Sequence, residues 1–177
     1  YYDGMPLGTP NDQGSGIRLG QSVGGKTDHM DRVTAWRFLN PPLAFAQGIV
    51  VNKNGRRFCN EMVYGATLGD AMCEKNDGKA YLIVDEKLFN DAKKQSKEAL
   101  PFQRDMARML MYFNAKKKNN LMDLAKVYNL PADSLSEEIE KYNQAARSQS
   151  PCEFGKGAAD VKELNGPFHI MDISIDS

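Results

Sequence analysis

The feature that most constrains the fold is a tight turn between two short apolar runs. Asn52-Lys53-Asn54-Gly55 separates Gly48-Ile49-Val50-Val51 from Arg56-Arg57-Phe58-Cys59. An Asn-Gly pair supplies the positive φ that a tight turn between antiparallel strands needs. The pattern predicts a β-hairpin over residues 48–59, so the fold must contain at least a small sheet.

Two further runs indicate extended chain. Tyr81-Leu82-Ile83-Val84 is a short apolar run between Gly78 and Asp85-Glu86, which is typical of a buried strand. Gly166-Pro167 introduces a last extended run from Phe168 to Ile175. Both runs are available to join the hairpin in one sheet.

Helical periodicity is clearest in the second half of the chain. One helix has apolar residues at i, i+3, i+4 and i+7 and is ended by Asn129-Leu130-Pro131; its apolar positions are Leu121, Leu124, Ala125 and Tyr128. The next helix has Pro131 in its first turn, where the missing N–H is not needed. Its buried stripe is predicted to be Leu135, Ile139, Tyr142 and Ala146.

Two shorter helices complete the prediction. One lies between Gly16 and Gly24, and the other carries an apolar stripe that we expect in the core, formed by Met106, Met109, Leu110 and Phe113. The elements together predict an α+β fold, in which a small mixed or antiparallel sheet with a hairpin is packed by several helices.

Composition excludes several classes of function. The chain has 177 residues, with 23 Lys and Arg against 23 Asp and Glu, and 41% of its residues are hydrophobic. No apolar run approaches the roughly 20 residues needed to cross a bilayer, so we expect no membrane span. Zero net charge argues against electrostatic nucleic-acid binding, which needs a surplus of basic residues. The basic cluster Lys116-Lys117-Lys118 is interpreted as a solvated turn.

Cysteine and histidine spacing gives no metal site. Cys59, Cys73 and Cys152 are far apart and form no CxxC or CxxH pair, and structural disulfides are not expected. His29 and His169 are the only histidines, and neither has a second imidazole three or four residues away. We therefore predict no metal ligands.

A nucleotide-binding motif is present but lacks its structural context. Gly20 to Thr27 fits GxxxxGK[ST], with Lys26 in the lysine position, and the 81–84 run ends in Asp85, which would hold Mg²⁺. The motif requires a buried strand that leads into the loop, whereas Asn11 to Leu19 contains only two apolar residues, Ile17 and Leu19. A P-loop NTPase is kept as an alternative, and a non-enzymatic ligand-binding module as another.

Three segments, in order, resemble the FAD-dependent oxidoreductase 2 superfamily of soluble fumarate reductases and 3-ketosteroid dehydrogenases. Residues 14–25 are similar to that family's GDGIxMxxxxGA helix, and residues 48–61 to its G-I-x-V-N-x-x-G-x-R-F-x-N-E hairpin. Leu124-Ala125, Leu135, Tyr142-Asn143 and Gly166-Pro167-Phe168 follow its late L-A, L, Y-N and Pro-aromatic order. The hairpin motif is the most specific of the three.

The resemblance implies a fragment of a flavoprotein. The family's amino-terminal FAD fingerprint and its carboxy-terminal glycine-rich return are missing from the sequence. Residues 1–34 would be a remnant of the FAD-binding domain, 35–165 the cap or substrate domain, and 166–177 a return toward the FAD domain. FAD would be held mainly by the missing domain of the same parent chain, with Gly14 and Gly16 as candidate contacts here. The isolated fragment is then expected to be inactive.

The resemblance also implies which substrate class is acted on. Fumarate reductases carry an active-site Arg after the Asn-Glu pair and a His and a Glu upstream of the hairpin, where this chain has Gly65, Trp36 and Pro41. A dicarboxylate needs cationic or donor partners and a proton donor, which these residues do not provide. The resemblance therefore implies hydride transfer between flavin and a carbon–carbon bond next to a carbonyl, in a small apolar, steroid-like substrate.

Tyr64 and His169 are the candidate catalytic residues. Steroid dehydrogenases place a Tyr shortly after the Asn-Glu pair and another after the late Pro-aromatic, and Tyr64 and His169 stand at these positions. A phenol can move a proton beside the flavin, and an imidazole can donate to a ketone oxygen. Each also has a structural interpretation, as a packed aromatic and as a satisfied strand histidine.

The neighbouring motif residues are interpreted structurally. Arg56 and Arg57 are expected to brace the hairpin, and Asn60 and Glu61 to secure the turn into the next helix. Trp36 and Phe38 either belong to the core or line an apolar substrate pocket.

Overall fold

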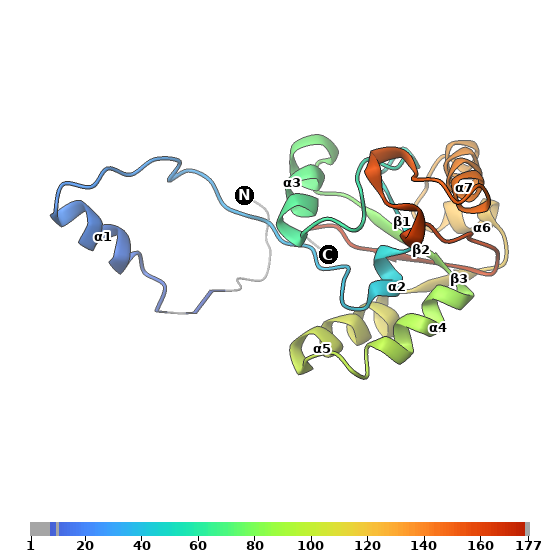
Figure 1. The fold of residues 1–177 in the computed structure, drawn as a ribbon, viewed down its shortest axis with the longest axis horizontal. Coiled ribbons are helices and arrows are strands. Elements are labelled where there is room, and N and C mark those ends of the chain that lie inside the picture. The colour runs from blue at the N-terminus through green and yellow to red at the C-terminus, as the bar shows by residue number, and fades with distance from the viewer. Residues whose placement is uncertain (1–7, 10, 176–177) are drawn as a thin grey trace.

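A four-stranded antiparallel sheet is the centre of the fold. The computed structural model describes residues 8–9 and 11–175, and in these the strand order is β1-β2-β4-β3 (Figure 1). The strands are β1 (Ile49–Val51), β2 (Tyr81–Asp85), β3 (Lys116–Lys118) and β4 (Phe168–Asp172). The predicted α+β class with a small antiparallel sheet is confirmed.

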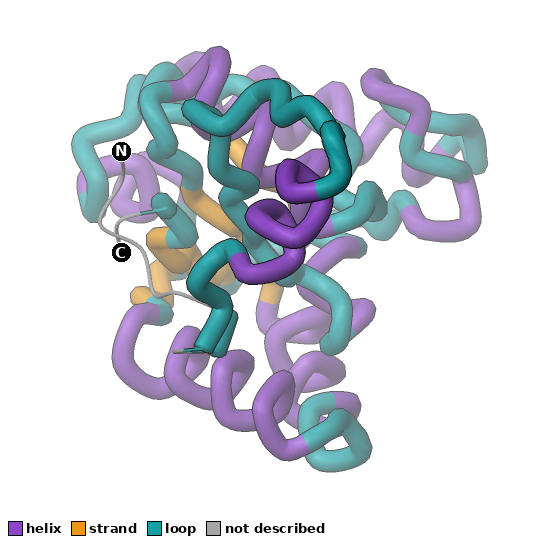
Figure 2. The backbone as a smooth tube through the Cα atoms, turned by 90° about the vertical axis from the view of Figure 1, so that its left-hand side faces the viewer, coloured by secondary structure: helices purple, strands orange, loops and turns teal. Residues whose placement is uncertain are grey.

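Helices surround this sheet, and Figure 2 shows the strands enclosed between them. The α-helices are α1 (Ser15–Ser22), α2 (Leu43–Ala46), α3 (Gly65–Asn76), α4 (Glu86–Gln95), α5 (Pro101–Met109), α6 (Leu121–Lys126) and α7 (Ala132–Arg147). A π-helical turn η1 (Leu110–Asn114) continues α5, and two 3₁₀ turns, η2 (Glu153–Gly155) and η3 (Ala158–Asp160), precede β4. No helix among the described residues is both long and apolar enough to cross a membrane.

The central strands are buried on both faces. Tyr81 of β2 stacks on Tyr128, which follows α6, with ring centroids 4.7 Å apart. His169 of β4 pairs with Val84 and stacks on Phe89 of α4. Side chains alternate between the faces of a strand, so Tyr81 and Val84 point to opposite sides. The sheet therefore lies between α4 on one face and the α6 region on the other.

The predicted turn forms, but the predicted hairpin does not. Gly55 has φ +69°, its N–H donates to the Asn52 carbonyl at 2.9 Å, and the Asn52 N–H donates to the Arg56 carbonyl at 2.9 Å. Beyond the turn only one bridge remains, between Val51 and Arg57. Residues 56–59 form no strand, and β1 pairs with β2 instead.

A side chain explains the lost hairpin. The Val50 N–H donates to Glu61 Oε1 at 3.0 Å rather than to a backbone carbonyl of a partner strand. The same carboxylate binds the guanidinium of Arg57, the bridge residue itself, and holds that side chain in the interior. An ionic contact therefore replaces the ladder that the sequence pattern predicted.

The helices of the second half of the chain agree with their periodicity. Leu135, Ile139 and Tyr142 are buried on α7, and Leu124 and Ala125 are buried on α6. α6 is followed by Asn129 with a positive φ of 54°, as its stop signal predicted. Pro131 stands at the N-cap of α7 rather than inside the first turn, which places it one position earlier than predicted.

Two expectations about the surface were wrong. The Lys116-Lys117-Lys118 cluster is solvated as predicted, but it is edge strand β3 rather than a turn, paired with β4. Lysines on an edge strand discourage pairing with another chain. Of the stripe expected in the core, Met109 and Phe113 are exposed, at 55% and 80%, whereas Met106 and Leu110 are half-buried. The buried residues of α5 and η1 are Ala107 and Met111.

The segment before the sheet stands apart. α1 forms where it was predicted, but none of its residues is buried, and Figure 1 shows it at the end of a long loop away from the sheet. β4 falls within the predicted return segment 166–177 and is an inner strand of the sheet.

Candidate functional site

Three aromatic side chains meet where α3 begins. Trp36 lies 4.6 Å from Tyr64 between ring centroids in an edge-on arrangement, and 5.2 Å from Phe38. We call Trp36, Phe38 and Tyr64 the aromatic cluster. Tyr64 is 64% exposed and Phe38 is also exposed, whereas the next residue along, Leu39, is buried. The cluster is therefore a surface feature of the fold rather than part of its core.

Backbone contacts hold the cluster together. The Arg37 N–H donates to the Gly65 carbonyl at 3.1 Å, which fixes the segment that carries Trp36 and Phe38 against the start of α3. Gly69 makes this approach possible, because a Cβ there would lie 2.1 Å from the Ala35 carbonyl oxygen.

The turn before Tyr64 is fixed by the Asn-Glu pair of the motif. Asn60 Oδ1 accepts from the Met62 N–H at 2.9 Å, and the Asn60 carbonyl accepts from the Val63 N–H at 3.2 Å. Glu61 is buried and accepts from the Val50 N–H. The structural roles predicted for Asn60 and Glu61 are confirmed.

Under the turn lies a buried ionic network of Arg57, Glu61 and Lys156. Arg57 Nε and one terminal nitrogen donate to Glu61 at 2.9 and 2.8 Å, and Lys156 Nζ lies 3.4 Å from the same carboxylate. Lys156 Nζ also donates to the Gly48 carbonyl at 2.7 Å. Both cations lie over the Tyr142 ring, with Arg57 Cζ 5.1 Å and Lys156 Nζ 4.9 Å from its centroid, as in a cation–π contact.

The network contains two cations for one carboxylate. Burial opposes the charged form of Arg57, but contact with Glu61 raises the pKa of Arg57 above its usual range. Burial lowers the pKa of Lys156. The predicted bracing role of Arg57 is confirmed, and Arg56 braces the same turn from outside through Glu137 and Glu138 of α7. Sequence reasoning missed Lys156, since a single Lys between two glycines has no periodic signal.

His169 lies in the interior of the sheet. Its side chain is 6% exposed, its ring stacks on Phe89 at 3.8 Å, and its Nε2 lies 2.7 Å from Glu86 Oε2. Burial lowers the pKa of His169, so the neutral ring donates to the carboxylate. Contact with Lys117 and then His169 lowers the pKa of Glu86 to about 2.

Tyr64 and His169 are not brought together among the described contacts. Tyr64 contacts Trp36, whereas His169 contacts Phe89 and Glu86. Nε2, the atom that would approach a ketone oxygen, is already engaged. In this arrangement only Tyr64 is available to a molecule at the surface.

The candidate cofactor glycines do not form a cradle for a dinucleotide. Gly14 has φ +73° at the N-cap of α1, and Gly16 has no atom within 4 Å of a Cβ position. Neither glycine is packed against another part of the fold. The described residues therefore do not fit the ADP half of FAD, and any contact from Gly14 or Gly16 requires a further domain.

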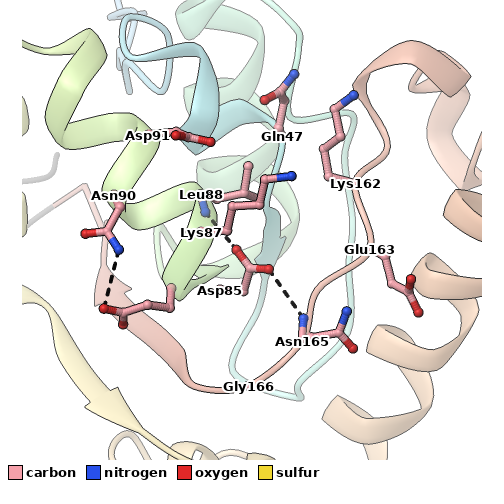
Figure 3. A pocket seen from close by; sticks show the side chains of 11 residues that line it. Gln47, Asp85, Lys87, Leu88, Asn90, Asp91, Lys162, Glu163, Asn165 and Gly166 are labelled. Carbon is pink, nitrogen blue, oxygen red and sulfur yellow. Dashed lines mark hydrogen bonds between the residues drawn. The ribbon is translucent and has the colours of Figure 1, made fainter.

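The P-loop alternative is not supported. The whole segment 20–27 is exposed and no strand leads into it. Asp85 caps α4 by accepting from the Leu88 N–H at 2.8 Å, and its second oxygen accepts from Asn165 N–H at 3.4 Å (Figure 3). The carboxylate that would hold Mg²⁺ is used to start a helix. Among the described residues no three His, Cys, Asp or Glu side chains are grouped as metal ligands.

The groove in Figure 3 is lined mostly by polar side chains, and acidic residues outnumber basic ones in it. Its volume is about 680 Å³, and it lies beside the start of α4 and the loop before β4. Its charged residues are Lys87 and Lys162 on the one hand and Asp85, Glu86, Asp91 and Glu163 on the other. It does not include the aromatic cluster.

Comparison with known proteins agrees with the motifs. No protein-family model matches the chain. The chain is 40% identical over 178 residues to 3-oxo-5-alpha-steroid 4-dehydrogenase of Comamonas testosteroni, covering 99% of this chain and 34% of that protein. It is 30% identical over 169 residues to fumarate reductase 1 of Saccharomyces cerevisiae, covering 82% of this chain and 34% of that protein.

A solved structure shares the fold. The 3-ketosteroid-Δ4-(5α)-dehydrogenase of Rhodococcus jostii RHA1, crystallised with 4-androstene-3,17-dione, matches with TM-score 0.70 and 27% identity, over 91% of this chain and 32% of that one. These relatives are flavoprotein dehydrogenases and reductases, and the predicted resemblance to their superfamily is confirmed. The fold is that of their cap domain, and the chain spans about a third of the length of the curated relatives it matches.

Proposed function

We propose that the parent protein is an FAD-dependent oxidoreductase of the ketosteroid dehydrogenase kind, and that this chain supplies its cap. The observation that carries the proposal is the exposed aromatic cluster, held at the start of α3 by the family motif. The 40% identity to a steroid dehydrogenase supports it. Residues 1–34 are proposed as a remnant of the FAD domain, 35–165 as the cap, and 166–177 as the segment that returns toward the FAD domain.

The substrate is proposed to be a small apolar carbonyl compound with a steroid-like ring system. Trp36 and Phe38 offer flat apolar faces, and the polar groups that a dicarboxylate needs are absent at Gly65 and Pro41. The Rhodococcus relative was solved with a steroid dione, which supports the same substrate class.

Tyr64 is proposed to move the proton. Dehydrogenation next to a carbonyl removes a hydride from one carbon and a proton from its neighbour, and reduction adds both. Bound FAD would exchange the hydride, and the Tyr64 phenol would take or deliver the proton from the exposed face of the cluster. A cap over this site also keeps water away from the reaction. The catalytic role of His169 stays a prediction.

The proposal is tested in the full-length parent protein with a panel of 3-ketosteroids. Tyr64→Phe should lower kcat by about 10²- to 10⁴-fold, the usual contribution of a general acid or base, with a small change in KM. Tyr112→Phe is the matched control, since Tyr112 is equally exposed on η1 and lies outside the cluster. Unchanged turnover in Tyr64→Phe would remove Tyr64 from the proposal, and His169→Ala tests the other predicted residue in the same assay.

Flavin content is a second test. The purified 177-residue chain should be colourless, because its described residues do not fit the ADP half of FAD. The full-length protein should be yellow. Stoichiometric flavin absorbance in the 177-residue chain would contradict the division of the parent into a FAD domain and this cap.

A further inference from the structure

We propose that the outer face of α5 and η1 is a docking surface for an anionic lipid bilayer. The surface, here called the apolar patch, consists of exposed large apolar residues, namely Leu100, Phe102, Met109, Tyr112 and Phe113. The inference is independent of the proposed function.

The helix geometry explains why this face has no partner within the described chain. Phe102, Met109 and Phe113 are separated by seven and four residues and therefore share one side of a helix. Ala107 and Met111 are the buried residues of the same segment, and they lie on the opposite side. The helix is thus fixed to the fold by one face and presents a second apolar face outward, which single scattered hydrophobic residues would not do.

Charge selects the partner. Residues 93–118 contain eight Lys and Arg but only two Asp and Glu, in a chain with 23 of each. Arg108, Lys116 and Lys118 are exposed in this segment, and Lys117, also exposed, pairs with Glu86 at 2.8 Å. An apolar protein partner would not require this excess of basic residues, whereas the anionic headgroups of a bilayer attract basic side chains.

The shape also suits a flat surface. The residues of the apolar patch line neither the groove beside α4 nor the smaller cavity beside Arg57 and Cys152. Phe and Tyr side chains on a protruding helix can enter the headgroup and acyl boundary, while flanking Lys and Arg bind the headgroups. Since no helix of the described part spans a membrane, the contact would be a reversible one in the plane of the bilayer.

The test is co-sedimentation with phosphatidylcholine vesicles that contain or lack phosphatidylserine, using the full-length parent and the 177-residue chain. Both proteins should bind the anionic vesicles, and raised salt should weaken the binding. Met109→Ser/Phe113→Ser should lower the partition coefficient by about tenfold or more, since two large apolar side chains are lost from the contact. Lys116→Glu/Lys118→Glu should abolish the preference for phosphatidylserine.

The matched control is Leu19→Ser/Val23→Ser, on α1 and at its C-cap, where the two apolar side chains are at least as exposed but have no concentration of basic residues around them. This variant should bind as the wild type does. The proposal is overturned if the full-length protein does not bind anionic vesicles, including the case in which only the 177-residue chain binds. It is also overturned if Met109→Ser/Phe113→Ser binds vesicles as well as the wild type does. The same holds if the wild type is a dimer that does not bind vesicles and the double substitution makes it monomeric.

Discussion

Replacing Glu61 should destabilise the fold far more than replacing Lys156, although both side chains are fully buried and touch each other. Glu61→Gln removes the only carboxylate of the network and leaves the guanidinium of Arg57 and the ammonium of Lys156 buried without a counter-charge. Removing one partner of a buried ion pair costs about 3–5 kcal/mol. The free energy of unfolding of Glu61→Gln should fall by that amount.

Lys156→Met keeps a balanced pair. The two hydrogen bonds from Arg57 to Glu61, at 2.9 and 2.8 Å, remain, and the flexible methionine fills most of the vacated volume. The variant loses the 2.7 Å hydrogen bond to the Gly48 carbonyl, which costs about 1–3 kcal/mol. Removing an ammonium whose pKa is lowered by burial offsets part of this loss. The net cost should be about 1 kcal/mol.

Urea unfolding of the 177-residue chain at neutral pH, followed by circular dichroism, measures the difference. Glu137→Gln is the control: Glu137 pairs with Arg56 at the surface, and its loss should change stability by no more than about 0.5 kcal/mol. A Lys156→Met variant as unstable as Glu61→Gln would refute the reasoning, because it would mean that the lysine contributes more than the charge balance allows.

Three further predictions concern packing, capping and pH. Gly69→Ala should lower the free energy of unfolding by about 1–3 kcal/mol, since its Cβ would meet the Ala35 carbonyl at 2.1 Å, whereas Gly16→Ala, with open space, should not lower the melting temperature. Asp85→Ala should cost about 1–2 kcal/mol in urea unfolding through the lost α4 cap and should leave an ATP titration featureless; ATP affinity that depends on Asp85 would contradict the assignment. The free energy of unfolding should fall as the pH drops below 6.5, because burial lowers the pKa of His169 and the unfolded chain therefore binds that proton first. It should fall again below pH 4.5, because the pKa of Glu86 is lowered to about 2 in the folded chain and the unfolded chain is again protonated first. His169→Phe should flatten the first of these slopes in urea unfolding on both sides of pH 6.5, and an unchanged slope would assign it to another group.

The parts of the fold that sequence could predict are those governed by local periodicity. β2, α6 and α7 follow from apolar spacing and stop signals, and the Gly55 turn follows from its positive φ. The strand expected over 56–59 failed because its pattern contains no information about Glu61, whose carboxylate takes the Val50 N–H from across the turn. A side chain that competes with the backbone ladder is a tertiary effect.

The apolar spacing of a helix also does not determine which of its faces packs against the core. The stripe of Met109 and Phe113 has the spacing of a core face, yet the fold buries Ala107 and Met111 instead. Periodicity shows that a helix has an apolar face, but two apolar faces can be told apart only when the rest of the chain is packed.

Of the two candidate catalytic residues, the position of one could be predicted from local sequence and that of the other could not. Tyr64 follows a turn and opens a helix, which puts it near the surface whatever the sheet register. The direction of His169 depends on the register of β4, where it pairs with Val84 and Lys117 on the side covered by α4. Sequence order cannot reveal that side, since a register shift of one residue would reverse it.

The motif that identifies the family therefore acts mostly as support for one exposed residue. Arg57 and Glu61 are buried in the network and Asn60 closes the turn, whereas Tyr64, at the end of the turn, is exposed. Lys156 lies 92 positions after Tyr64 in the sequence and reaches Glu61 through the interior, so under the proposed function we expect it to influence the position of Tyr64 through this turn. Lys156→Met in the full-length parent should then lower kcat under conditions in which the variant, destabilised by about 1 kcal/mol, stays folded. A cap that positions Tyr64 through Asn60 alone would leave kcat unaffected.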